Sequence, residues 1–303
     1  MYQSHFGLRE APFRLTPDTA FFFPGSSHQE ALNVLRVALS NGEGFIKITG
    51  EVGLGKTLLC RTLLASLDTH FFSAWIPNPD QSPASMRAAL ARELGVELPC
   101  HPEQDRVLRL ITFRLLELAV AGRRPVLVID EAQALPTATL EAVRLLTNIE
   151  TEHRKLLQVV LFGQPELDRR LAQPSLRQLR QRITFSHCLQ PLDAIAVSSY
   201  VRHRLRVAGH ADGELFSAPA LRDLARASRG VPRLINVLAH KALLAGWGRG
   251  RARVGRVELA RAIADTEDVA RSRRPALLWL TAFTGILIAV SIAVSLGWWG
   301  WPG

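Results

Sequence analysis

Apolar and polar residues alternate along the chain with two different spacings. Near-continuous apolar runs occur at 45–49, 71–76, 125–130, 156–163 and 183–189, and the stretches between them carry apolar residues at three- and four-residue intervals. Continuous aliphatic runs are typical of strands buried on both faces of a parallel sheet, and the wider spacing is typical of amphipathic helices. The pattern predicts an α/β fold with a doubly wound sheet of five parallel strands.

Helices are predicted in the intervals between these runs. Ser27 and Glu30 have the spacing of a capping box, in which each side chain accepts from the other residue's backbone N–H at the start of a helix. The predicted helices of this part of the chain cover 28–40, 56–67, 84–94 and 104–121.

From residue 193 onward the strand pattern stops and only helical spacing remains. The predicted helices here cover 193–208, 217–228, 232–246 and 256–268. We therefore predict an α/β domain over residues 1–192, which includes an aromatic, proline-rich N-terminal segment, and a small all-helical domain over residues 193–270.

The segment 276–296, "ALLWLTAFTGILIAVSIAVSL", has no charged residue. At about 1.5 Å per residue its 21 residues span roughly 30 Å, the thickness of a bilayer core. A buried core helix is the alternative, but such a helix normally keeps a polar stripe. Trp279 precedes most of the segment and Trp298 follows it, as in an aromatic belt. The sequence predicts a transmembrane helix.

The charges around this segment predict its orientation. Arg271, Arg273 and Arg274 lie in a basic linker, 271–275, on its N-terminal side, and no basic residue follows it. Because positive charge favours the cytoplasmic side, residues 1–274 are expected in the cytoplasm and 297–303 across the membrane. The first twenty residues are mixed and broken by proline, unlike a signal peptide.

The formal charge of +10 is unevenly distributed. Residues 1–192 have 21 Lys and Arg against 19 Asp and Glu, whereas residues 193–274 have 16 against 8. Such an excess is typical of a nucleic-acid or anionic-lipid neighbour, or of an ordinary solvated face. The three cysteines are far apart and form no C-x-x-C pair, which predicts neither a disulfide framework nor a zinc site and favours a reducing compartment.

The stretch "TGEVGLGKTLLC" lies between the first predicted strand and a predicted helix. Its spacing of Gly50, Gly55, Lys56 and Thr57 fits G-x-x-x-x-G-K-[ST], in which backbone N–H groups and the helix N-terminus surround phosphate oxygens. Lys56 would reach the β and γ phosphates, and the Thr57 hydroxyl would bind magnesium. The alternative is a simple glycine turn. The predicted ATP-binding residues are Gly50, Glu51, Val52, Gly53, Leu54, Gly55, Lys56, Thr57 and Leu58.

Two acidic residues end the strand "VLVID". Asp130 and Glu131 would project from the carboxyl edge of the sheet towards the phosphate loop. Asp130 is predicted to hold Mg²⁺, and Glu131 to orient and deprotonate the attacking water. An acidic pair that merely caps a strand is the alternative. The two motifs together predict a magnesium-dependent ATPase.

Further polar residues occur at suggestive places. Gln164 follows the next strand, where its amide would sense the γ phosphate. Arg177, Arg180 and Arg182 precede the last strand, where an arginine finger could enter a neighbouring subunit's site, and Arg182 is nearest the strand. Arg233 opens a helix of the helical domain and would contact the nucleotide. An arginine near a helix end is more often simply a solvated side chain, but the occurrence of all these residues after the right strands favours the functional interpretation.

This order of motifs resembles that of the AAA+ ATPases, in which the helical domain is a lid. The segments "FGLREAPFRLTPDTAFFFPGSSHQEAL", "VIDEAQALPTATLEAVRLLTNIET", "LFGQPEL" and "LRQRITFSHCLQPL" resemble the ExeA/GspA group of secretion ATPases, and within it most closely the MSHA-type IV pilus biogenesis ATPases of the MshM type. The resemblance implies a homo-oligomeric ATPase of the bacterial inner membrane with its tail in the periplasm. It would act with other inner-membrane proteins in assembling a pilus or secretion apparatus.

A different class of function is also compatible with this core. Transposition helper ATPases, which act as nucleotide-dependent DNA-binding switches, share much of it and are often basic. The predicted membrane helix argues against this alternative, and no helix-turn-helix or basic aromatic strand face supports it. A scaffold that binds ATP without hydrolysing it is disfavoured by Glu131. Leu54 departs from the threonine often found in the group, at a position that contributes mainly its backbone N–H.

Overall fold

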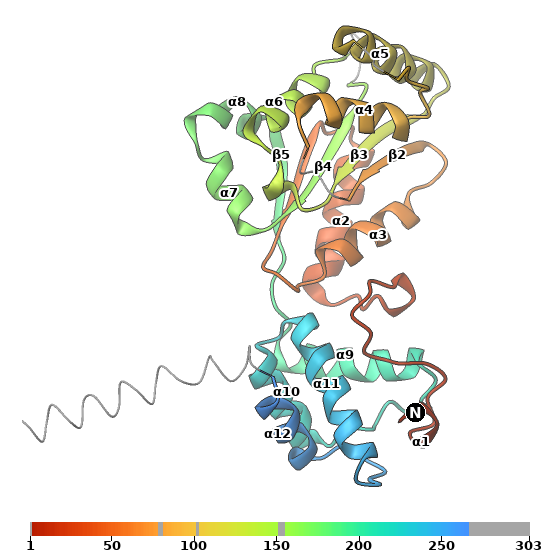
Figure 1. Ribbon diagram of the computed structural model, residues 1–303, viewed down its shortest axis with the longest axis vertical. Helices are drawn as coiled ribbons and strands as arrows, with labels where there is room; N and C mark the ends of the chain where they lie inside the picture. The colour runs from red at the N-terminus through yellow and green to blue at the C-terminus, as the bar shows by residue number, and fades with distance from the viewer. Residues whose placement is uncertain (1, 78–80, 101–102, 151–154, 267–303) are drawn as a thin grey trace, which may run out of the picture.

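The computed structural model describes residues 2–266 except 78–80, 101–102 and 151–154. It has an α/β domain and a helical bundle, stacked along the long axis of the molecule (Figure 1). The basic linker, the transmembrane helix and the tail predicted over 271–303 lie outside the described residues. Within the described ranges, no helix combines the length and the apolar character needed to cross a membrane.

The α/β domain is built on a five-stranded parallel sheet, which confirms the predicted architecture. The strand order is β2-β3-β4-β1-β5. The strands are β1 (Phe45–Thr49), β2 (Phe71–Ile76), β3 (Arg124–Ile129), β4 (Gln158–Gly163) and β5 (Ile183–Cys188). The carboxyl ends align, since Thr49 pairs with Gly163 and Ile129 with Leu161. Loops that leave these ends therefore meet along one edge of the sheet.

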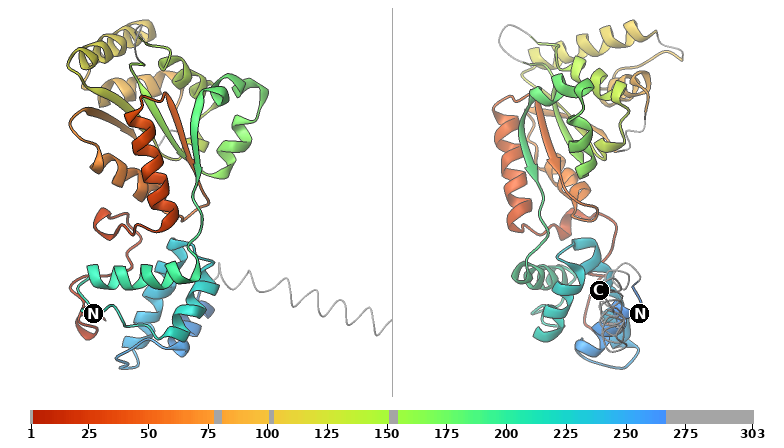
Figure 2. Two further views of the ribbon diagram at one scale, coloured as in Figure 1. Left: turned by 180° about the vertical axis from the view of Figure 1, so that it is seen from behind. Right: turned by 90° about the vertical axis from the view of Figure 1, so that its left-hand side faces the viewer.

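Helices cover both faces of the sheet (Figure 2). One face packs against α2 (Ser26–Ser40) and α3 (Lys56–Ser66). The other packs against α4 (Pro83–Glu93), α5 (Gln104–Val120), α6 (Thr137–Leu146), α7 (Pro165–Leu171) and α8 (Arg177–Arg182). Strand β4 shows why its sequence is continuously apolar, because Val159 and Val160 are both fully buried but belong to opposite cores.

The start of α2 differs from the prediction. The helix begins at Ser26 with Gly25 as its N-cap, and the capping box predicted from Ser27 and Glu30 is wrong. The Ser27 hydroxyl instead accepts a hydrogen bond of 2.9 Å from the backbone N–H of Gln190. It thereby joins α2 to the segment after β5, a contact that sequence spacing does not reveal.

The helical bundle contains four longer helices. They are α9 (Ala194–Val207), α10 (Ala218–Ser228), α11 (Pro232–Trp247) and α12 (Arg256–Ala264). Their boundaries agree with the prediction to within one residue, except that α12 ends at Ala264 rather than at 268. Elsewhere in the described ranges there are three short 3₁₀ helices: η1 (Thr19–Phe21), η2 (Ala132–Ala134) and η3 (Pro174–Leu176).

The N-terminal segment packs with the bundle, although the sequence had grouped it with the α/β domain. The short helix α1 (Tyr2–His5) contacts α11, and Phe6, Phe13 and Phe21 are buried in the same core as α9 to α12. The Tyr2 hydroxyl forms a 3.0 Å hydrogen bond with Nδ1 of His240. The segment then returns to α2 and so links the two parts of the molecule.

Candidate nucleotide site

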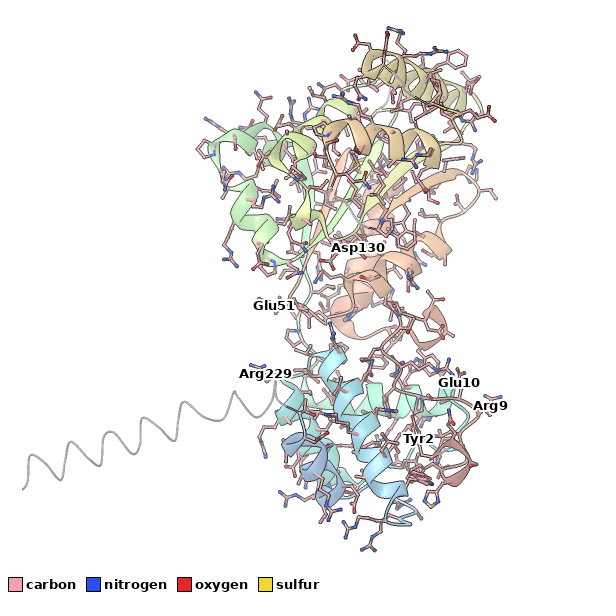
Figure 3. The ribbon with its side chains drawn as sticks, viewed as in Figure 1. Tyr2, Arg9, Glu10, Glu51, Asp130 and Arg229 are labelled. Carbon is pink, nitrogen blue, oxygen red and sulfur yellow. The ribbon has the colours of Figure 1, made fainter. Side chains whose placement is uncertain are left out.

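The phosphate-loop motif lies at the carboxyl edge of the sheet, between β1 and α3. Gly53 and Gly55 have φ angles of 83° and 91°, in the left-handed region that favours glycine. Helix α3 begins at Lys56, and its N-cap, Gly55, supplies no side-chain hydrogen bond to the first turn. The N–H groups of that turn are thus left for an external acceptor, as an anion-binding helix start requires. Figure 3 shows Glu51 between the two domains.

Lys56 lies inside the loop with only 5% of its surface exposed. Its Nζ donates hydrogen bonds to the carbonyl oxygens of Gly50 at 2.7 Å and Glu51 at 3.0 Å. Burial lowers the pKa of the Lys56 ammonium, and the carboxylates of Glu131 and Asp130 oppose that effect. The loop therefore holds a partly desolvated cation beside the N–H groups of α3.

Asp130 and Thr57 meet at the end of β3. The Asp130 carboxyl, 2% exposed, accepts from the backbone N–H of Glu131 at 2.9 Å and is hydrogen-bonded to the Thr57 side chain. Burial raises the pKa of Asp130, and these two hydrogen bonds oppose the shift. A hydroxyl beside a carboxylate is a set of oxygen donors suited to Mg²⁺, so the residues present fit the predicted metal.

Glu131 is held in an unusual backbone conformation. Its φ of 52° lies in the left-handed region, which costs a non-glycine residue on the order of 1–3 kcal/mol and is often found at functional sites. Its Oε2 accepts hydrogen bonds from the side-chain amides of Gln133 and, at 3.2 Å, Gln164. The backbone N–H of Gln164 donates to Oε1 of Gln133 at 3.0 Å. The structure thus brings Glu131 and Gln164 together.

Gln133 is a member of this network that the sequence interpretation missed. Its only signal was its place in "DEAQ", two residues after Glu131. Its backbone carbonyl also accepts from the Arg170 guanidinium of α7. Gln133 therefore fixes the positions of the glutamate and of the glutamine on the neighbouring strand end.

The start of α11 contacts the phosphate loop directly. The backbone N–H of Arg233 donates to the Gly53 carbonyl at 3.2 Å. A Cβ atom on Gly53 would lie 2.8 Å from Cβ of Arg233, so only glycine permits this approach. The predicted residue Arg233 therefore lies at the junction of loop and bundle.

A cavity of about 360 Å³ lies at this junction. The phosphate loop, Glu131, Gln164 and Arg233 line it, as the sequence predicted for a nucleotide site. Residues outside the prediction complete the lining: Arg14, Leu15, Thr16, Pro17 and Asp18 from the N-terminal segment, and Tyr200, Arg204, Pro232 and Asn236 from the bundle. No motif of known spacing marks these residues, because they converge from both ends of the described chain.

Two arginines hold the N-terminal segment over the cavity. Arg204 is 4% exposed, donates to the Pro12 carbonyl and, at 3.0 Å, to the Tyr200 hydroxyl, and lies 4.7 Å from the ring centre of Phe21. None of the described carboxylates forms a salt bridge with it. Arg61 of α3 donates to the Pro17 carbonyl at 3.0 Å. One arginine thus fixes the segment to the bundle and the other fixes it to the phosphate-loop helix.

Arg204→Met is expected to raise the KM for ATP about tenfold while changing kcat about twofold or less, because it removes the charged hydrogen bonds to Pro12 and Tyr200 that hold the cavity wall. Steady-state ATPase kinetics measure the KM and the kcat of the variant. Arg206→Met, at an exposed position of the same helix, is the control and should leave KM unchanged. An unchanged KM in Arg204→Met would show that the N-terminal segment does not contribute to nucleotide binding.

The arginines of α8 lie away from the cavity of their own chain. Arg177 and Arg180 are exposed, and Arg182 is half-buried, with Nη1 donating to the Thr147 hydroxyl at 3.3 Å. None of the three lines the cavity described above. Their predicted action in a neighbouring subunit therefore stays a prediction, with Arg180 and Arg177 the freer side chains.

The parallel sheet, the phosphate loop and the carboxylates at the end of β3 are arranged as in a P-loop ATPase domain. Residues 39–171 match the family model described as an AAA domain. Two solved structures share the fold. Cdc6p from Pyrobaculum aerophilum is 20% identical with a TM-score of 0.64, over 87% of this chain and 70% of that one. Drosophila ORC bound to DNA is 19% identical with a TM-score of 0.64, over 100% of this chain and 80% of that one.

A curated relative narrows the class. The chain is 40% identical over 301 residues to General secretion pathway protein A of Aeromonas hydrophila, which covers 99% of this chain and 54% of the relative. The chain thus spans about half the length of that protein. The matched AAA domain and this similarity agree with the resemblance to the ExeA/GspA group that the sequence motifs carry, and the finer resemblance to the MshM type stays a prediction.

Proposed function

We propose that the chain is a membrane-anchored AAA+ ATPase that couples ATP hydrolysis to assembly of a secretion apparatus or an MSHA-like type IV pilus. The observation that carries the chemistry is the convergence of Lys56, Thr57, Asp130 and Glu131 beside a cavity closed by the start of α11. The relative's name supports the secretion role, and the sequence motifs support the pilus role.

The residues divide the chemistry among them. The loop N–H groups and Lys56 would neutralise the β and γ phosphates. Thr57 and Asp130 would hold Mg²⁺, which when bound would supply positive charge beside the phosphate oxygens. Glu131 would orient and deprotonate the attacking water. The side-chain amide of Gln164 donates to the Glu131 carboxylate, so Gln164 would respond to the loss of the γ phosphate through that hydrogen bond. Arg233 adds positive charge from the bundle side.

The same contacts give a route from hydrolysis to motion. The Gly53 carbonyl accepts a hydrogen bond from the Arg233 N–H, so a conformational change of the phosphate loop would shift the position of α11. The bundle would move with α11 and act as a lid. In a homo-oligomer, the α8 arginines would carry that change to the next subunit. Other inner-membrane assembly proteins are the proposed partners on which the motion acts.

The decisive experiment isolates full-length protein with its membrane partners. Glu131→Gln protein in ATP should retain assembly proteins of a pilus or secretion system that Lys56→Ala protein fails to retain, because only the former holds a stable ATP-bound state. Mass spectrometry identifies what co-purifies. Equal retention by the two variants would contradict nucleotide-controlled partner binding.

Membrane topology follows from the sequence pattern of 271–303. A reporter enzyme that is active only outside the cytoplasm, fused after Gly303, is expected to be active, because three arginines precede the apolar segment and no basic residue follows it. The same reporter inserted at Arg253, in an exposed loop of the bundle, should be inactive. An inactive reporter after Gly303 together with an active reporter at Arg253 would contradict the predicted cytoplasmic location of the ATPase domain.

A DNA-binding role remains the alternative, supported by the positive excess of residues 193–274. The likeness to ORC shows the fold alone, and DNA binding is stated for that protein. Salt-dependent retention of DNA by the full-length protein separates the two functions. Retention with a steep salt dependence, sensitive to ATP, would favour the switch over the assembly ATPase.

A further inference from the structure

A second cavity, of about 280 Å³, lies at the edge of the sheet opposite the nucleotide site. Arg124 and Gln158, the first residues of β3 and β4, line it together with Gly42, which precedes β1. Since the strands are parallel, this edge is the amino end of the sheet, while the phosphate loop lies at the carboxyl end. The cavity plays no part in the ATPase chemistry described above.

Three cations line this cavity, and none of its described lining residues is acidic. Arg123 donates to the Phe71 carbonyl at 2.9 Å, with its guanidinium 4.9 Å from the ring centre of Phe72. Arg124 donates to the Ser40 carbonyl at 2.7 Å. Backbone carbonyls and a ring thus fix both guanidinium groups, and their positive charge is left for an external anion. Lys155, the third cation, forms no salt bridge with a described carboxylate.

Gln158 is a buried polar residue in the lining of this cavity. Gln158 is 3% exposed, and its Nε2 donates hydrogen bonds to the carbonyl oxygens of Leu39 at 3.1 Å and Glu43 at 3.0 Å. Its Oε1 has no partner among the described atoms. A ligand carboxylate, as an acidic polypeptide segment has, would complement the cations of this cavity.

An apolar stripe on α5 runs to the rim of the same cavity. Phe113, Leu116 and Val120 are 62%, 41% and 89% exposed, and their spacing of three and four residues places them on one helix face. Ala119, beside Val120, lines the cavity. Helix α5 lies at the end of the molecule farthest from the bundle (Figure 1). Exposed apolar stripes rimmed by polar residues are typical of protein contact sites.

We propose that this cavity and the α5 stripe form a docking surface for a partner-protein segment that combines a carboxylate with apolar residues. The carboxylate enters the cavity between the guanidinium groups and Lys155, and the apolar side chains cover Phe113, Leu116 and Val120. Nucleic acid fits less well, since residues 1–192 carry nearly balanced charge, 21 against 19, and the stripe offers nothing to phosphates.

Selection from a random peptide library displayed on phage, with the detergent-solubilised full chain as bait, tests the proposal. Enriched peptides should contain Asp or Glu flanked by apolar residues. A labelled enriched peptide should bind at least about tenfold more weakly to Lys155→Glu and to Val120→Asp than to the wild type. Arg253→Glu, the same charge change at an exposed position of the bundle, should bind as tightly as the wild type.

Several results would overturn the docking surface. These are no enrichment over empty support, enrichment of neutral or basic peptides, and affinities unaffected by Lys155→Glu and Val120→Asp. Displacement of the peptide by a labelled oligonucleotide that itself needs Lys155 would identify a nucleic-acid site instead. Unchanged ATP turnover in both variants shows that they fold, so failure here is distinguishable from failure of the ATPase assignment.

Discussion

Glu131→Gln is expected to bind ATP with nearly wild-type affinity and to hydrolyse it at least about 100-fold more slowly. The amide has the size of the carboxylate and leaves the phosphate loop unchanged, but it cannot take a proton from water. Its carbonyl oxygen can still accept from both Gln133 and Gln164, which now donate to one carboxylate oxygen, so the hydrogen-bond network around it is preserved. Phosphate release and binding of a fluorescent ATP analogue measure the two effects.

Lys56→Ala is the contrasting variant and should lose both binding and turnover, because it removes the buried ammonium of the phosphate loop. Glu166→Gln is the matched control, since Glu166 is an exposed carboxylate paired with Arg169 on α7. It should keep wild-type turnover. Hydrolysis by Glu131→Gln at the wild-type rate would show that another group activates the water.

The second large effect concerns the arginines of α8. Arg180→Ala combined with Arg182→Ala is expected to lower turnover about 1,000-fold while each subunit still binds ATP, as for an arginine finger that acts in the neighbouring site. The structure supports action in trans because neither side chain lines its own cavity. The single variants Arg180→Ala and Arg182→Ala identify the finger, because only the variant that lacks it should lose turnover. The two arginines differ in the structure, since the Arg182 guanidinium donates to the Thr147 hydroxyl.

Mixing supplies the matched control for this prediction. The double arginine variant and Lys56→Ala are each inactive alone, but together they should recover part of the turnover, because the intact loop of one meets the intact finger of the other. The recovered activity should rise with protein concentration. Absence of recovery at every ratio, with activity of the wild type independent of concentration, would indicate a monomeric enzyme.

Most residues that converge at the candidate nucleotide site could be named from the sequence because their motifs are local. A phosphate loop is one turn between a strand and a helix, so Gly50 to Thr57 are recognisable from spacing alone. Asp130 and Glu131 follow from the rule that the ends of parallel strands share one edge. The structure brings these residues together, and it adds Gln133, whose role depends on hydrogen bonds to Glu131 and Gln164 that no spacing encodes.

The sequence by itself determined the strands, most of the longer helices and the order of motifs, because burial on both faces of a sheet and on one face of a helix leaves periodic patterns; α6, α7 and α8 were not among the predicted helices. Only the tertiary structure decided where the first twenty residues pack and what closes the nucleotide cavity. In the sequence, Phe13 and Phe21 are only apolar residues near a proline. They are buried in the bundle core because they contact residues nearly two hundred positions away. Arg204 shows the same limit, since a buried arginine is recognisable only when the carbonyl of Pro12 and the hydroxyl of Tyr200 are seen around it.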